Sequence, residues 1–352
     1  MQHRQRSAEE AGADSVQGLQ HASVFPEALG TGIVMHTARP IDDDLYERLR
    51  LMIEDYEAVL SRFRENSLLS TMSRAQHGGS FDFPDYLAPL FEMYDGLFDA
   101  THGAIDPLVG SDLVKLGYGP DLAFHAIPHA RDAVGAIHGR TNWGEAVTRH
   151  GTTLITRQAL HLDFGAAGKG FMVDLLAAAC AERHDHYLID AGGDLRIECL
   201  DAVRVALEDP FNEDEAVGMA NLTHASLCAS APSRRRWTVP GEKADGSDTS
   251  DCEGGPVMMH HLLNAIDGMP ANEVAATWVT QRTSSDSASR DHTNGAVGIE
   301  AFPTALADGL STALFVCDPS SLAESFEFEC AVVLSDRSAL LSRDFPGRLF
   351  TA

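Results

Sequence analysis

The segment that most constrains the fold of this chain is 160–176, Leu-His-Leu-Asp-Phe-Gly-Ala-Ala-Gly-Lys-Gly-Phe-Met-Val-Asp-Leu-Leu. Apolar residues alternate at its start, which predicts a strand, followed by a glycine-rich turn and a helix that begins near Lys169. Free backbone N–H groups at a helix start attract anions, and glycines let a ligand approach the backbone. Lys169 adds a full positive charge and is one of three lysines among 26 basic residues. The pattern favours a phosphate site, although a helix start packed on a strand has the same sequence signature.

The turn does not match the common phosphate-binding loops. Residues 165–170 lack the glycine spacing of a dinucleotide-binding loop, and no serine or threonine follows the lysine. Features elsewhere in the chain must therefore decide between the two interpretations.

Composition restricts the class of protein. With 352 residues, of which 44% are hydrophobic, the chain can bury a large core as one domain or two. Its formal net charge of −26 argues against nucleic acid or an anionic membrane as a partner, because a polyanion would be repelled. The six cysteines lack CxxC spacing and are mostly flanked by apolar residues, as at Cys180 and Cys317, so we expect buried reduced thiols.

The two ends and two internal stretches are polar. The first residues are basic but no apolar stretch follows them, and no run of 18 apolar residues occurs, so we expect a cytoplasmic chain without membrane insertion. We expect residues 1–22 to form a disordered tail. The stretches 241–255 and 283–294 are too polar to bury anything, which predicts surface loops or disordered insertions.

Periodicity indicates a mixture of helices and strands. Apolar spacing predicts helices over 42–63, 86–97 and 304–316, and the acidic run at 42–44 is typical of a helix start rather than a metal site. Alternation predicts strands at 203–207 and 331–334, and a hairpin at 190–198 that turns at Gly192 and Gly193.

Asp308 and Thr312 form a second candidate site. Four residues of separation place the carboxylate and the hydroxyl on one face of the predicted helix. Oxygen ligands of this kind suit a hard cation such as Mg²⁺, which keeps several waters and binds substrate phosphates. Without further information, a surface aspartate and a packed threonine would explain the pattern equally well.

Several motifs occur together and in order. Asp163, Gly165, Lys169, Gly170 and Asp174 match D-x-G-x-x-x-K-G-x-x-x-D, a signature of the ApbE family of FAD:protein FMN transferases. Between about residues 25 and 340 the chain resembles this family in further blocks, which are Gly30-Thr31, the serine and aromatic block at 61–70, Gly-Leu-Phe-Asp-Ala-Thr-His-Gly at 96–103, Gly-Gly-Asp-Leu-Arg at 192–196 and Ala-Asp-Gly-Leu-Ser-Thr-Ala-Leu-Phe at 307–315. The ordered set is far more specific than any single block.

The resemblance implies both a fold and an activity. The expected fold is α+β, a single large ApbE-like (T-fold-like) domain of mixed sheets and helices over 23–352, with the two polar insertions. The expected activity is the Mg²⁺-dependent transfer of FMN from FAD to a Thr or Ser hydroxyl of a target flavoprotein, through a phosphoester bond, with release of AMP. The family's acceptor pattern is D-x-x-[ST]-G-[AS]-T, which this chain lacks, so the expected acceptor is another protein.

The resemblance also implies site residues. Asp308, Thr312 and a main-chain oxygen of Ala166 are expected to hold Mg²⁺, with Mn²⁺ as an alternative, and Asp308 is expected to be catalytic. The residues expected to bind the flavin substrate FAD are Leu29, Phe63, Asp99, Ala100, Thr101, Asp163, Lys169 and Leu262.

His261 is the expected general base, because it matches the histidine of the family motif H-[IVL]-[IL]-D-P-x-T-G-x-P. Asn264, Ala265 and Asp267 replace the aspartate, proline and threonine of that motif. The neighbouring His260 is expected to point the opposite way on a strand. A further departure lies at 228–237, where Ala231 and Ser233 replace the glycine and tyrosine of many relatives.

Two other functions use the same residues. Without an acceptor hydroxyl, the metal site would act as an FAD pyrophosphatase that releases FMN and AMP. If the altered His261 segment does not support turnover, the chain would be a flavin-binding or carrier protein.

Overall fold

The structure, a computed structural model, describes residues 18–127, 129–241, 254–283 and 298–350. The predicted polar insertions at 241–255 and 283–294 lie almost entirely outside these ranges, as do residues 1–17 of the predicted tail and Cys252. The tail prediction extends too far, because Leu19 is buried and the first strand begins at His21.

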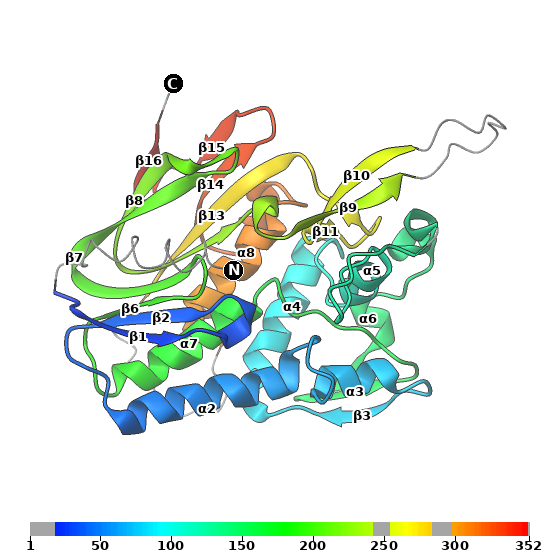
Figure 1. Cartoon of the computed structure of the whole chain (residues 1–352), viewed down its shortest axis with the longest axis horizontal. Helices are drawn as coiled ribbons and strands as arrows, with labels where there is room; N and C mark the ends of the chain where they lie inside the picture. Colours follow the sequence, from blue (N-terminus) through cyan, green and yellow to red (C-terminus); the bar gives the residue numbers. More distant parts are fainter. Residues whose placement is uncertain (1–17, 128, 242–253, 284–297, 351–352) are drawn as a thin grey trace.

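A large antiparallel sheet forms one half of the molecule (Figure 1). Its strand order in the described residues is β1-β2-β6-β7-β8-β13-β14-β15, with β16 paired to β8. The strands are β1 (His21–Phe25), β2 (Ile33–Thr37), β6 (Tyr187–Asp190), β7 (Asp194–Asp209), β8 (Asn212–Ser230), β13 (Val274–Arg282), β14 (Glu329–Leu334), β15 (Ala339–Leu341) and β16 (Gly347–Leu349). The combination of this sheet with helices confirms the predicted α+β class.

Helices α7 (Gly168–Ala181) and α8 (Pro303–Ala313) pack together against this sheet, and α2 (Asp43–Leu60) packs on α7. The two central helices can approach closely because residue 170 is glycine. A Cβ atom there would lie 2.4 Å from the carbonyl oxygen of Thr304. Apolar side chains from the sheet and these helices form the main core.

The other half of the molecule surrounds α4 (Ala88–Ala100) (Figure 1). It contains three small antiparallel sheets and several short helices. Its strands are β3 (Gly79–Asp82), β4 (Thr148–His150), β5 (Thr153–Thr156), β9 (Arg236–Gly241), β10 (Gly254–His260), β11 (Leu263–Asn264) and β12 (Met269–Pro270). The remaining helices and 3₁₀ turns are α3 (Leu68–Arg74), α5 (Val109–Lys115), α6 (Trp143–Ala146), α9 (Pro319–Leu322), η1 (Ala28–Gly30), η2 (Asp85–Leu87), η3 (Ala130–Ala133), η4 (Ala136–His138), η5 (Pro232–Arg234) and η7 (Ile299–Ala301).

The predicted helices exist with shifted ends. The Asp42 side chain accepts a hydrogen bond from the N–H of Leu45, which confirms the acidic run as a helix start. Helix α2 ends at Leu60 rather than Phe63, because Ser61 has extended dihedral angles. The helix predicted at 86–97 is α4, preceded by η2, and the helix predicted at 304–316 is α8, which ends at Ala313.

The strand predictions are mostly confirmed. The hairpin joins β6 to β7, Gly192 and Gly193 have positive φ, and 203–207 and 331–334 lie in β7 and β14. The strand predicted at 160–164 is wrong, since this segment belongs to no sheet of the described residues. Its alternating residues are instead buried against aromatic side chains, as where the Phe164 and Tyr94 rings meet edge to face.

Cysteines 180, 199, 228 and 330 are buried free thiols, as predicted, and Cys317 is half-buried. Among the described residues, no helix has the length and apolar character needed to cross a membrane.

Candidate functional site

Three charged side chains meet where α7 begins. Lys169 forms an ion pair with Asp194, which lies at the start of β7, and its Nζ is 3.5 Å from Oδ1 of Asp308 on α8. Asp194 is fully buried and Asp308 is 2% exposed, whereas the Lys169 side chain is 30% exposed. The glycine-rich turn, the Gly-Gly-Asp-Leu-Arg turn and α8 therefore meet at one point.

When both carboxyl groups are ionised, the cluster has more negative than positive charge. Burial and the neighbouring Asp194 carboxylate raise the pKa of Asp308 to about 8, and Lys169 only partly offsets them. Burial also raises the pKa of Asp194, and Lys169 again opposes it. Oδ1 of Asp194 is buried without a hydrogen-bond partner among the described atoms. A cation would relieve this arrangement of two carboxylates around one ammonium group.

Backbone contacts fix the position of Asp308. Its Oδ2 accepts a hydrogen bond of 3.0 Å from the N–H of Gly170, and its Cβ lies 2.8 Å from where a Gly170 Cβ would be. A Cβ at Gly309 would lie 3.4 Å from the Cβ of Ala167, so the turn that contains Ala166 lies along this part of α8. The hydroxyl of Tyr94 accepts hydrogen bonds from the N–H groups of Ala166 and Ala167 at 3.1 and 3.2 Å, which holds the turn in place.

Thr312 lies one helical turn after Asp308, beside other hydroxyl groups. Its Oγ1 is 3.5 Å from Oγ of Ser230, which is 2.8 Å from Oγ of Ser311. The end of β8 therefore adds hydroxyl oxygens next to the predicted metal ligands.

The donor set expected for the metal is one carboxylate, one hydroxyl and one main-chain oxygen. In the part of the chain that the structure describes, no group of three or more His, Cys, Asp or Glu side chains is arranged to hold a metal. A set with a single carboxylate would not form such a group. The excess negative charge and the oxygen chemistry fit a hard cation that keeps waters or substrate oxygens in its remaining positions.

Asp163 connects this cluster to an aromatic wall. Its Oδ2 accepts a hydrogen bond of 2.5 Å from Nε of Arg62, and its Oδ1 accepts one of 2.6 Å from the N–H of Gly165. The Arg62 guanidinium lies 4.2 Å from the ring centre of Phe63 and 4.6 Å from that of Tyr118. Phe63 is 39% exposed, so its ring is open to a ligand.

His261 directly follows β10, whose last residue, His260, pairs with Arg236 at the start of β9. Its Nδ1 is 3.2 Å from the carbonyl oxygen of Arg235, and burial lowers its pKa to about 4. His260 is buried and its Nε2 faces Oδ1 of Asn272 at 3.3 Å. The two histidines thus have different hydrogen-bond partners.

The Leu29 and Leu262 positions flank this region. Leu29 has a positive φ of 53°, and its N–H donates to Oε1 of Glu57 at 3.1 Å. A Cβ at the next residue, Gly30, would lie 3.4 Å from Nη2 of Arg235. Leu262 is buried, and its N–H donates to Nδ1 of His260.

Asp99 and Ala100 are not brought into contact with this group. They line a surface depression whose opposite wall includes Glu324 and Phe326, and neither Lys169 nor Asp308 lines it. Thr101 is buried, where its hydroxyl donates to the carbonyl oxygen of Leu97 and accepts from the N–H of Ile105. Its side chain therefore ends α4 rather than facing a cavity.

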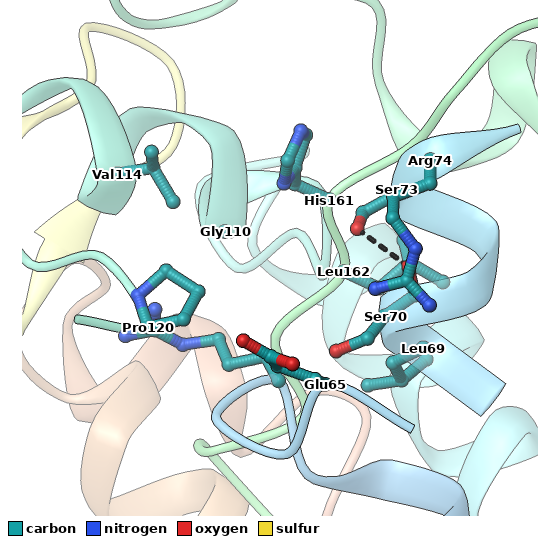
Figure 2. Close-up of a pocket in the computed structure, with 11 residues that line it drawn as sticks. Glu65, Leu69, Ser70, Ser73, Arg74, Gly110, Val114, Pro120, His161 and Leu162 are labelled. Atoms are coloured by element: carbon teal, nitrogen blue, oxygen red, sulfur yellow. Dashed lines mark hydrogen bonds between the residues drawn. The ribbon is translucent and has the colours of Figure 1, made fainter. Parts of the chain in front are cut away.

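A separate cavity of about 110 Å³ lies behind Arg62. Figure 2 shows His161, Glu65 and Arg74 around it, with Ser70 and Ser73 on the same helix, α3. Lys169, His261 and Asp308 do not line this cavity. It is therefore distinct from the charged cluster, although Arg62, which lines it, also pairs with Asp163.

Sequence reasoning did not name several residues that the fold brings to the site, which are Arg62, Tyr94, Tyr118, Asp194, Ser230, Arg235 and Ser311. Asp194 stood within a matching motif and could have been found as a charged residue between two buried strands. Arg62, Ser230, Arg235 and Ser311 also lie within quoted segments, but their contacts at the site are long-range and could not be read from those segments. Tyr94 and Tyr118 lie outside the quoted segments.

The ApbE family model matches residues 29–334. The FAD:protein FMN transferase of Klebsiella pneumoniae is 22% identical over 68% of this chain and 72% of its own length, and that of Treponema pallidum is 24% identical over 86% and 74%. Two solved structures share the fold, the flavin transferase ApbE from Vibrio cholerae (TM-score 0.68, 20% identity) and the ApbE protein from Thermotoga maritima (TM-score 0.70, 18% identity), each over 92% of this chain and 97% of the other. The chain therefore belongs to the ApbE family.

Proposed function

We propose that this protein transfers FMN from FAD to a threonine or serine hydroxyl of a target flavoprotein and releases AMP. The observation that carries this proposal is the meeting of Lys169, Asp194 and Asp308 where the glycine-rich turn begins α7. The names of the curated relatives, which are FAD:protein FMN transferases, agree with it. The acceptor is expected to present the pattern D-x-x-[ST]-G-[AS]-T.

Asp308, Thr312 and the main-chain oxygen of Ala166 would hold Mg²⁺, or Mn²⁺ in its place. When bound, such an ion neutralises charge on the pyrophosphate oxygens of FAD. Lys169 orients Asp308 and Asp194, and its remaining donor is available to a phosphate oxygen. The N–H groups at the start of α7 add a positive dipole.

The remaining residues bind the flavin and move a proton. Phe63 offers a partly exposed side chain beside Arg62, and Asp163, Leu29 and Leu262 are further proposed flavin contacts. The family resemblance alone supports the assignment of Asp99, Ala100 and Thr101 to the flavin pocket, because Asp99 and Ala100 line a separate depression and the Thr101 hydroxyl is bonded within its own segment. The acceptor oxygen attacks the FMN phosphorus, a new P–O bond forms, the P–O bond to AMP breaks, and His261 takes the hydroxyl proton.

Hydrolysis is the competing function, because water could replace the acceptor hydroxyl at the same phosphorus. The protein would then be an FAD pyrophosphatase that releases FMN and AMP. Burial keeps the His261 ring neutral at neutral pH, as a general base requires in either reaction, so the identity of the acceptor decides between transfer and hydrolysis.

The test is to incubate the protein with FAD, Mg²⁺ and a flavoprotein domain that bears the acceptor pattern, and then to weigh the acceptor. A mass gain equal to the FMN moiety supports transfer, and the same acceptor with its threonine changed to valine is the control. Release of AMP without a gain on the acceptor would support the hydrolase instead. Neither product would support a flavin carrier.

A metal control belongs in the same experiment. Thr312→Val keeps the side-chain shape but removes the hydroxyl oxygen, so we expect a reduced rate that added Mg²⁺ partly restores. A defect that does not respond to Mg²⁺ across a titration would contradict the assignment of Thr312 to the metal.

A further inference from the structure

Arg235 connects two parts of the candidate site. Its carbonyl oxygen lies 3.2 Å from Nδ1 of His261. Nη2 of its guanidinium lies 3.4 Å from where a Cβ atom would be at Gly30, the residue after Leu29. Its Nη1 donates to the hydroxyl of Tyr118. One residue therefore touches the candidate base through its main chain and the flavin side of the site through its side chain.

The other cations of the site are already neutralised. Lys169 lies between Asp194 and Asp308, and Arg62 is paired with Asp163. The Arg235 guanidinium, in contrast, contacts the neutral Tyr118 hydroxyl and forms no ion pair with a carboxylate of the described residues. In a chain with a formal net charge of −26, an unneutralised guanidinium beside a proposed base is well suited to an anionic ligand.

The surroundings keep this guanidinium in place. The Tyr118 ring stacks on Trp237 with 5.4 Å between ring centres and lies 6.0 Å from the Arg235 guanidinium carbon. The indole N–H of Trp237 donates to the carbonyl oxygen of Leu116, so the wall behind Arg235 is fixed. A Cβ atom at residue 30 would touch Nη2, so glycine at this position lets the guanidinium lie close to the backbone beside Leu29.

We propose that Arg235 binds the phosphate group attached to the flavin ribityl chain and holds it beside His261. This proposal rests on the proposed function for the identity of the ligand. The phosphorus under attack must lie close to His261, which takes the acceptor proton. The main-chain carbonyl oxygen of Arg235 is hydrogen-bonded to His261. A guanidinium at this place also stabilises the negative charge that develops on the phosphate oxygens during transfer.

The experiment measures binding separately from turnover. Dissociation constants of FAD, FMN and riboflavin are measured by flavin fluorescence for the wild type, Arg235→Gln, Arg235→Lys and the control Arg236→Gln, which changes the exposed neighbouring arginine. For Arg235→Gln we expect FAD and FMN to bind roughly 10- to 100-fold more weakly, the range for loss of a hydrogen bond to a charged group. Riboflavin carries no phosphate, so its affinity should stay the same, which also shows that the variant is folded.

Arg235→Lys keeps the charge and should recover part of the affinity, and Arg236→Gln should match the wild type. Equal weakening of riboflavin, or unchanged affinity for FAD and FMN, would overturn the proposal. Weakening of FAD alone would also overturn it, because Arg235 would then contact the adenylate phosphate. If the wild type binds flavin phosphates through Arg235 but does not modify an acceptor, the proposed function fails and this inference stands.

Discussion

The carbonyl oxygen of Arg235 lies 3.2 Å from Nδ1 of His261. A carbonyl oxygen can only accept, so Nδ1 of the neutral ring carries the proton and donates it to this bond. Nε2 is then unprotonated and free to accept a proton from a substrate. The main chain at the start of β9 therefore fixes the tautomer that a general base requires.

His261→Ala should lose transfer activity by about 10²- to 10⁴-fold, the range for removal of a general base. FAD affinity should change little, because the cluster at α7 and α8 is intact. The measurement is the rate of acceptor modification, with FAD binding followed in parallel. His260→Ala is the control and should retain most of the activity. Acceptor modification by His261→Ala at the wild-type rate would make Asp267 the next candidate base.

The pH dependence of transfer follows from the environment of His261. Burial lowers the pKa of His261 from 6.5 to about 4, so the ring is neutral and able to accept a proton throughout the neutral range. Titration of His261 should therefore leave the transfer rate unchanged between about pH 6 and 8 and lower it only as the pH approaches 4. A pH profile of kcat/KM measures this acid limb, which should be absent from the residual activity of His261→Ala. An acid limb centred near 6.5 would show that His261 is solvated in the free protein.

Local chemistry made some elements predictable from the sequence. Asp42 marks the start of α2 because its carboxylate caps a free N–H group, and Gly192 and Gly193 mark the hairpin because they adopt positive φ. The segment 160–164 was misassigned for an equally physical reason. Alternation reports that one side of an extended chain is buried, and here aromatic side chains rather than neighbouring strands cover that side.

The site was predicted in part. The motifs identified Lys169 and Asp308 as candidate site residues, and the structure places them close together where α7 packs on α8. The pairing of Lys169 with Asp194 and of Arg62 with Asp163 spans 25 and 101 residues of sequence, so no local pattern could have shown it. The side-chain roles expected for Asp99 and Thr101 could not be judged without knowing that Thr101 is buried at the end of α4.

Without metal, the protein should lose stability as the pH rises towards 8. The pKa of Asp308 is about 8 in the folded chain, against an ordinary value of 3.8. Between these two pH values the folded state binds more protons than the unfolded state, so the free energy of unfolding falls as the pH increases. Thermal unfolding from pH 5 to 8.5 measures this slope. Asp308→Asn, which keeps an acceptor for the Gly170 N–H, should flatten the slope and abolish FAD cleavage. Mg²⁺ should raise the melting temperature of the wild type most at high pH, and a metal effect of equal size in Asp308→Asn would contradict the assignment.

Lys169→Met should destabilise the metal-free protein by roughly 3–5 kcal/mol, because removing one partner leaves the buried Asp194 carboxylate without its cation. Chemical denaturation gives the free energy of unfolding. The double variant Lys169→Met with Asp194→Asn should recover much of the loss, since the uncompensated charge is gone. Additive losses in the double variant would show that the two residues do not act as a pair.

Asp174 belongs to the same motif as Lys169, but its contacts predict a role in stability. Its carboxylate accepts hydrogen bonds from the N–H groups of Thr304 and Ala305, at 2.9 Å each, and forms an ion pair with Arg196 at 3.1 Å. It therefore caps the start of α8 from within α7 and fixes the helix that carries Asp308.

Asp174→Ala should lower the free energy of unfolding by about 3–5 kcal/mol, because Arg196 would keep only Glu198 as a partner and the first N–H groups of α8 would lose their acceptor. The matched control is Asp42→Ala, which removes the exposed cap of α2 and should lower the free energy of unfolding much less. Urea denaturation of the two variants side by side measures the difference. At a temperature where Asp174→Ala is still folded, we expect it to bind FAD within a few fold of the wild type, because Asp174 contacts the helix and not the predicted ligand positions. Normal stability combined with lost FAD binding would instead place Asp174 in the binding site.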